Sequence, residues 1–250
     1  MRNNRYLYGW VVTFFLMTVA LALFSWIGSI YGIAEVQSLL SAEGVRWMLS
    51  HAVTNYVQVP ALGVVFVLLM GLGIVSRSGL FDVLKRAVRK DKKLSRKERK
   101  ALVLSFIAGI SYTLVVLVAM LLPWNLLLSA TGSWIHSPFS KGFVYLLSVG
   151  LGVSSMVYGY ASDAFQRIGD VVEAMSCLIS RHAIYFVALF FTVQFFSSLA
   201  YTRLPEWIGL SDDFFALISS FSFYFPLILL RWKKPLKFYK IRLDESFNAP

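Results

Sequence analysis

Six apolar stretches, each long enough to cross a lipid bilayer, constrain this chain more than any other feature of its sequence. A spanning helix needs about 20 apolar residues, and a stretch of roughly 18 is already a candidate span. Lipid offers the backbone no hydrogen-bonding partner, so every span must be helical. We therefore predict an all-α polytopic membrane protein that forms a single transmembrane domain over residues 1–250. The predicted spans are residues 7–31, 54–76, 101–123, 142–162, 182–202 and 213–230.

The composition supports this class of protein. The chain is 58% hydrophobic and 15% charged, whereas a soluble domain is about 45–50% apolar and about 25% charged. The net charge of +11 is compatible with nucleic-acid binding, but the basic residues flank the apolar stretches. We interpret them as determinants of membrane topology and predict no nucleic-acid partner. The single cysteine, Cys177, fits no zinc or redox spacing, and we predict no metal site and no cofactor.

The distribution of lysine and arginine predicts the orientation in the membrane. Basic residues concentrate at the N-terminus, in the loop 85–100 and in the tail 231–250, whereas only Arg46, Lys141 and Arg203 fall on the other side. Cytoplasmic loops carry the excess of positive charge, so both termini are expected in the cytoplasm. The basic loop is also expected to contact anionic lipid headgroups.

Two stretches between the spans have the periodicity of amphipathic helices. In SLLSAEGVRWML (38–49), Ser41 is a good N-cap, and Glu43 in the first turn suits the helix dipole. The stretch DAFQRIGDVVEAMSCLIS (163–180) also carries one apolar stripe. We predict that both form short helices at the membrane interface. The stretch 163–180 follows the fourth span as 38–49 follows the first span. With three spans in each half, the two halves would be inverted, as in many transporters.

The second predicted span opens with residues that disturb a helix. Asn55 and Gln58 are polar, and Pro60 removes a backbone donor. An interrupted span of this kind can form a substrate site in a secondary transporter, although it can also be a kink that serves packing. We predict Asn55, Gln58, Pro60 and Gln194 as candidate substrate-binding residues.

Small residues at regular spacing predict close contacts between helices. In the fourth span, this spacing favours internal packing or a dimer interface over a pore. The predicted helix-packing residues are Gly63, Gly71, Gly73, Ser148, Gly152, Ser155 and Gly159.

Two blocks of the sequence resemble the p-aminobenzoyl-glutamate transporter (AbgT) family. The first is SLLSAEGVRWML with NYVQVPALGVVFVLLMGLGIVSRSGLFDVLKR (55–86), and the second runs from SPFSKGF to QFFSSL (137–199). The resemblance implies a bacterial inner-membrane transporter, often dimeric, for a small organic anion such as an aromatic acylglutamate or a folate precursor. Family members also carry re-entrant hairpins that build the substrate site. Only residues 87–136 join the two blocks, so we expect a short relative that lacks those hairpin regions.

Two functions are consistent with the sequence. The first is a secondary transporter, or a transporter subunit, for a small organic anion. The alternative is a non-transporting scaffold or accessory protein, either a homodimer or a partner of another transporter subunit. The spans contain almost no ionisable residues, which weighs against autonomous proton-coupled transport. We predict no enzyme, because the sequence has no HExxH, GxSxG or P-loop motif, and His51, His136 and His182 are far apart.

Overall fold

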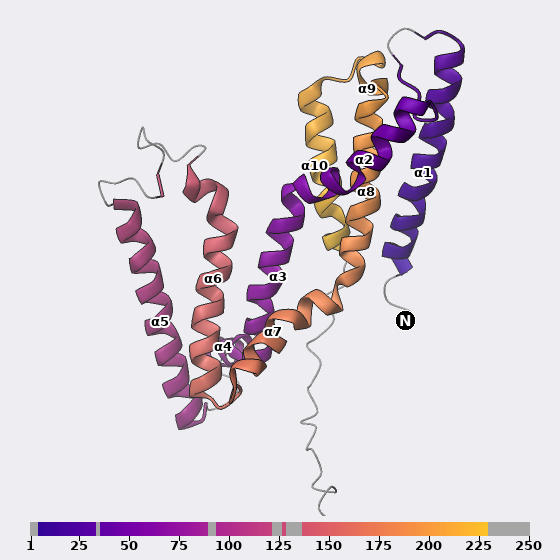
Figure 1. Cartoon of the computed structure of the whole chain (residues 1–250). Coiled ribbons are helices and arrows are strands. Elements are labelled where there is room, and N and C mark those ends of the chain that lie inside the picture. The colour runs from indigo at the N-terminus through magenta and orange to yellow at the C-terminus, as the bar shows by residue number, and fades with distance from the viewer. Residues whose placement is uncertain (1–4, 34–35, 90–93, 122–126, 129–136, 230–250) are drawn as a thin grey trace, which may run out of the picture.

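Helices make up nearly all of the protein that the computed structural model describes (Figure 1). The described residues are 5–33, 36–89, 94–121, 127–128 and 137–229. Six helices are long and apolar enough to cross a membrane: α1 (Arg5–Ile30), α3 (Pro60–Ser78), α5 (Arg96–Leu121), α6 (Pro138–Ala161), α8 (Ala183–Tyr201) and α10 (Asp212–Leu229). The predicted all-α polytopic fold with about six spans is therefore confirmed. The predicted basic tail (231–250), the centre of the basic loop and His136 lie outside the described residues.

Four shorter helices complete the described chain: α2 (Ala42–Gln58), α4 (Leu80–Arg89), α7 (Ile168–Arg181) and α9 (Leu204–Trp207). The two amphipathic stretches correspond to α2 and α7. As predicted, Ser41 caps α2, and its hydroxyl accepts a hydrogen bond of 3.0 Å from the Gly44 N–H. A Cβ at Gly44 would lie 2.4 Å from the Ser38 carbonyl oxygen, so only glycine fits this tight entry to the helix.

Helix α7 begins with a cap in which the Asp170 side chain binds the preceding backbone. The Asp170 carboxylate accepts hydrogen bonds from the backbone N–H groups of Gln166 (2.7 Å) and Arg167 (3.0 Å). These two bonds favour the charged form, so they hold the pKa of Asp170 below its usual range. A carboxylate in the first turn also interacts favourably with the positive end of the helix dipole, which stabilises the start of α7 at this position.

The helices form two interlocked units with the same order of elements. Helices α1–α2–α3 form the first unit and α6–α7–α8 the second. Helix α3 packs against α6 and α7, whereas α8 packs against α1 and α2, so each unit inserts its last helix between the other unit's first two (Figure 1). In each unit, a single residue separates the last two helices. Val59 ends α2 and precedes α3, and His182 ends α7 and precedes α8.

Polar side chains join the helices where they cross inside the fold. The Trp10 Nε1–H donates to Thr192 Oγ1 at 2.9 Å and ties α1 to α8. The Tyr185 hydroxyl, on a fully buried side chain, donates to the Phe223 carbonyl oxygen at 3.1 Å and ties α8 to α10. Without an aqueous phase to drive helices together, packing and hydrogen bonds of this kind hold a membrane bundle.

Three ion pairs lie together at one end of the fold. Arg77 at the end of α3 contacts Glu173 of α7 at 2.8 Å, and Arg86 of α4 contacts Glu98 of α5 at 2.8 Å. Lys97 of α5 pairs with Asp163, just after α6. Each pair is partly exposed, and exposed pairs contribute about 0–1 kcal/mol. Together these pairs connect the ends of five helices: α3, α4, α5, α6 and α7.

Candidate functional site

Helices α2 and α3 are separated by a break at Val59. Val59 is extended, with φ −70° and ψ 121°, and Pro60 is the first residue of α3. A residue before proline is biased away from helical angles, and proline is favoured in the first turn of a helix. The sequence predicts a second span that opens at residue 54, whereas the proline starts a new helix. Asn55 and Gln58 therefore belong to α2 rather than to α3.

Helix α2 runs antiparallel to α8 and is fixed to it at three levels. The Trp47 and Tyr201 rings stack with centroids 4.4 Å apart. The Gln194 Nε2–H₂ donates to the Ala52 carbonyl oxygen at 2.6 Å. Near the break, the Tyr56 hydroxyl donates to the Phe186 carbonyl oxygen at 3.0 Å. These contacts hold the last turns of α2, and hence the break, in one position against α8.

Asn55 lies within this contact, one turn after Ala52. Its Nδ2 atom is buried, and no residue that the structure describes provides it with a hydrogen-bond partner. Leaving a buried donor unsatisfied costs about 1–3 kcal/mol. A donor of this kind can bind an acceptor supplied from outside the chain, such as a carboxylate oxygen.

The four predicted substrate-binding residues are placed differently by the fold. Asn55 and Gln194 both lie at the contact between α2 and α8, where Gln194 binds the carbonyl group three residues before Asn55. The side chains of Gln58 and Pro60 are exposed. Tyr56 also belongs to this contact, although it is not among the residues predicted from the sequence. The sequence gives one indication of its role, which is a tyrosine hydroxyl between the polar residues Asn55 and Gln58.

The helix breaks leave the first turn of α3 without a side-chain cap. Val59 has no side-chain group that accepts a hydrogen bond from the start of α3, although the Leu62 N–H reaches the Val59 carbonyl oxygen at 3.1 Å. The amino end of a helix carries a partial positive charge from its free N–H groups. The start of α3 therefore offers a favourable potential for a negatively charged group.

Below the break, small residues bring α3 close to its neighbours. A Cβ at Gly71 would lie 2.7 Å from the Ser148 carbonyl oxygen of α6, and one at Gly73 would lie 2.3 Å from the Ala174 carbonyl oxygen of α7. The Ser148 hydroxyl donates to the Val67 carbonyl oxygen at 2.6 Å. By contrast, a Cβ at Gly63 would meet no atom within 4 Å.

The other predicted packing residues lie on the inner side of α6. Ser155 is fully buried, and a Cβ at Gly152 would lie 3.3 Å from Ile74 Cδ1 of α3. A Cβ at Gly159 would lie 2.2 Å from the ring of Phe165, in the turn between α6 and α7. Small side chains at these positions allow α6, α3 and α7 to pack closely together, which holds α3 in place after the break.

Comparison with known proteins identifies the family of this chain. The sequence profile of the AbgT putative transporter family matches residues 6–92 and 85–218. The two matched segments overlap at residues 85–92. No curated protein matches the sequence.

Two solved structures share the fold. The first is MtrF from Neisseria gonorrhoeae, described as one of a class of antimetabolite efflux pumps. Its TM-score is 0.73 at 16% identity, and the alignment covers 88% of this chain and 80% of MtrF. The second is the YdaH transporter of Alcanivorax borkumensis, with a TM-score of 0.63 at 16% identity over 80% of this chain and 74% of YdaH. Because the profile matches most of the sequence, this multi-pass membrane protein belongs to the AbgT transporter family.

Proposed function

We propose that this protein, alone or as a transporter subunit, moves a small organic anion such as an aromatic acylglutamate or folate precursor across the bacterial inner membrane. The substrate would bind at the break between α2 and α3. The observation that carries the proposal is the buried Asn55 Nδ2 atom, which lacks a partner within the described chain. A substrate carboxylate would satisfy this donor and recover the cost of its desolvation.

The surroundings of Asn55 support an anionic substrate. The amino end of α3, which has no side-chain cap, lies in the same region and carries the positive end of the helix dipole. In secondary transporters, the amino ends of interrupted helices point at anionic groups of the substrate. Gln58, exposed on the last turn of α2, offers a second amide, and Pro60 shapes the site by ending α2. Gln194 acts as a positioning residue because it holds the α2 backbone against α8.

The comparisons support transport of this type without identifying the substrate. MtrF, whose fold this chain shares, is described as an antimetabolite efflux pump. An aromatic acylglutamate has a flat apolar ring and carboxylates. The Tyr56 and Phe190 rings, which pack edge to face with their centroids 5.4 Å apart, would offer an aromatic surface to the ring of such a ligand.

We also propose an orientation in the membrane from the distribution of the basic residues. Lys85 and Arg86 of α4 and Arg96 of α5 lie at the same end of the fold as Arg77. We propose that this end faces the cytoplasm, together with the start of α1 and the end of α10, as the positive-inside rule predicts. We also propose that the protein forms a homodimer.

A non-transporting scaffold is the second candidate function. It is favoured by the position of the charged groups, because the three ion pairs in the described part of the chain lie at helix ends rather than deep within the spans. A coupled transporter usually keeps ionisable side chains within the membrane for its coupling ion.

Equilibrium binding of radiolabelled p-aminobenzoyl-glutamate to the purified protein in detergent tests the proposed site. Hydrogen bonds to charged groups contribute about 1.5–3 kcal/mol, so Asn55→Ala is expected to weaken binding roughly 10-fold or more. The matched control is Thr54→Ala, which truncates the neighbouring, exposed side chain of the same helix and is expected to leave the Kd unchanged. Equal affinity in Asn55→Ala and the wild type would exclude this site, and no binding by the wild type would favour the scaffold.

A further inference from the structure

We propose that the outer face of α5 near its amino end binds an anionic phospholipid. Arg96, Arg99 and Lys100 would contact the phosphate of the headgroup, and Val103 and Leu104 would contact the acyl chain. This inference does not depend on the proposed transport function, because none of these residues lies near the break between α2 and α3.

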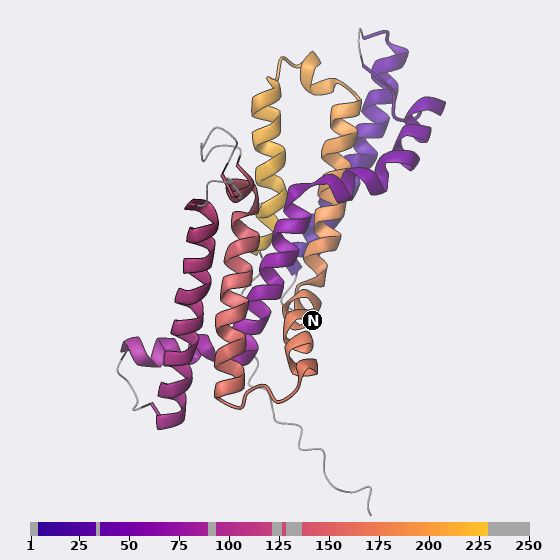
Figure 2. The same ribbon diagram turned by 60° about the vertical axis from the view of Figure 1, so that its left-hand side comes forward.

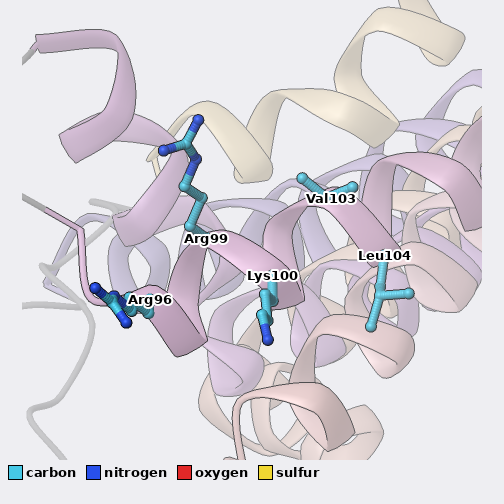
Figure 3. Close-up of a pocket in the computed structure, with 5 residues that line it drawn as sticks. All are labelled: Arg96, Arg99, Lys100, Val103 and Leu104. Carbon is cyan, nitrogen blue, oxygen red and sulfur yellow. The ribbon is translucent and has the colours of Figure 1, made fainter.

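These five residues line one open hollow of about 470 Å³ (Figure 3). Their spacing along α5 is i, i+3, i+4, i+7 and i+8, which places them on one face of the helix. Figure 3 shows the three basic side chains at one end of this face and the two aliphatic side chains beyond them. The hollow therefore changes from cationic to apolar along the helix axis, as a phospholipid changes from headgroup to chain.

The opposite face of α5 is occupied by α6. The Ser105 hydroxyl donates to the Ser154 carbonyl oxygen at 2.8 Å, and the Tyr112 hydroxyl donates to the Leu146 carbonyl oxygen at 2.9 Å. Figure 2 shows α5 at the edge of the molecule, with α6 between it and α3. The hollow thus faces away from the rest of the described protein.

The apolar part of this face continues along the helix. Val103 is 52% exposed, and the following residues on the same side remain open: Ile107, Ile110 and Leu114. In a helix that crosses a membrane, an exposed aliphatic stripe of this length lies against acyl chains. The cations at its end would then lie at the level of the headgroups, where long basic side chains reach the interface.

Charge complementarity favours an anionic headgroup. Neighbouring charges on α5 are already paired, since Glu98 binds Arg86 and Lys97 binds Asp163. Within the described part of the chain, Arg96, Arg99 and Lys100 form no ion pair, and all three are exposed. Each basic residue near an anionic membrane surface adds attraction, and together they would select an anionic lipid over a zwitterionic one.

A second copy of the chain is a poorer occupant of the same face. A two-fold axis through the face and normal to the membrane would place Arg96, Arg99 and Lys100 opposite the same three cations. Like charges brought together at an interface oppose association. The anionic lipid supplies the countercharge that a second copy does not.

Lipid binding is measured by native mass spectrometry of the full chain released from neutral detergent, with phosphatidylglycerol as the probe. The test variant is the triple substitution Arg96→Gln, Arg99→Gln and Lys100→Gln. The matched control is Arg46→Gln, Lys141→Gln and Arg203→Gln, which removes the same charge from exposed positions elsewhere. We expect the test variant to bind phosphatidylglycerol roughly 10-fold or more weakly, and we expect the control to bind like the wild type.

Further arms separate the lipid from other occupants. Phosphatidylcholine with the same acyl chains is expected to bind weakly to all three proteins, and inorganic phosphate is expected not to displace phosphatidylglycerol. The proposal is overturned if both triple variants lose binding equally, if phosphatidylcholine binds as tightly, or if free phosphate competes. A monomer–dimer shift specific to the test variant would instead assign the face to a second copy. The single variant Arg99→Gln, expected to show an intermediate loss, repeats the test if the triple variant does not fold.

Discussion

Gly73→Ala is expected to destabilise the protein by about 3 kcal/mol or more. The added Cβ would lie 2.3 Å from the Ala174 carbonyl oxygen, a backbone atom that cannot move without shifting α7. Overpacking of a tight contact costs about 1–3 kcal/mol, and occasionally more where backbone must move. The free energy of unfolding, measured by denaturant titration in detergent micelles, gives the result.

Gly63→Ala is the matched control, because it makes the same change in the same helix where a Cβ would meet no atom within 4 Å. Alanine favours a helix over glycine by about 1 kcal/mol. The control is therefore expected to be neutral or slightly stabilising, opposite in sign to Gly73→Ala. Equal effects of the two substitutions would show that α3 and α7 do not approach as closely as described.

Leu189→Ala is expected to cost about 2 kcal/mol or more in the free energy of unfolding. Leu189 is 0% exposed and packs within the cluster that joins α1, α3 and α8. Removing its branched end leaves a cavity and forfeits many dispersion contacts. The unfolded helices also remain in an apolar medium, so the loss is mainly one of packing rather than of transfer from water.

The control for Leu189→Ala is Leu217→Ala in α10, whose side chain is 66% exposed and would face lipid. Because no cavity forms there, the change is expected to stay below about 0.5 kcal/mol. Thermal unfolding of both variants in the same detergent separates them. A loss at Leu217 as large as that at Leu189 would contradict the described packing of α8.

The sequence predicted the helices better than their breaks. Six spans followed from apolar length, and the cap at Ser41 followed from a local rule that needs no knowledge of distant residues. Pro60 was harder to interpret, because a proline in an apolar run can either kink one helix or begin another. In the structure, Pro60 begins a new helix, so Asn55 and Gln58 belong to α2.

The partners of the predicted residues could not be predicted, because they are distant in sequence. Gln194 binds a carbonyl group 142 residues away, and Arg77 pairs with Glu173, 96 residues away. Spacing identifies a small residue without saying which face of the helix meets a neighbour. Gly63 and Gly73 illustrate this, since only one of the two lies against another helix. The interlocking of α3 and α8 therefore had to be observed.

Gradient-driven flux in proteoliposomes is the most direct test of transport through the break between α2 and α3. The purified wild-type chain, reconstituted with an imposed proton or sodium gradient, is expected to move radiolabelled p-aminobenzoyl-glutamate, and movement is expected to stop when the gradient is dissipated. Asn55→Ala is expected to reduce the rate roughly 10-fold or more, in line with its loss of binding, whereas Thr54→Ala is expected to transport normally. Absence of gradient-driven movement of any aromatic acylglutamate by the wild type would contradict the account and favour the scaffold.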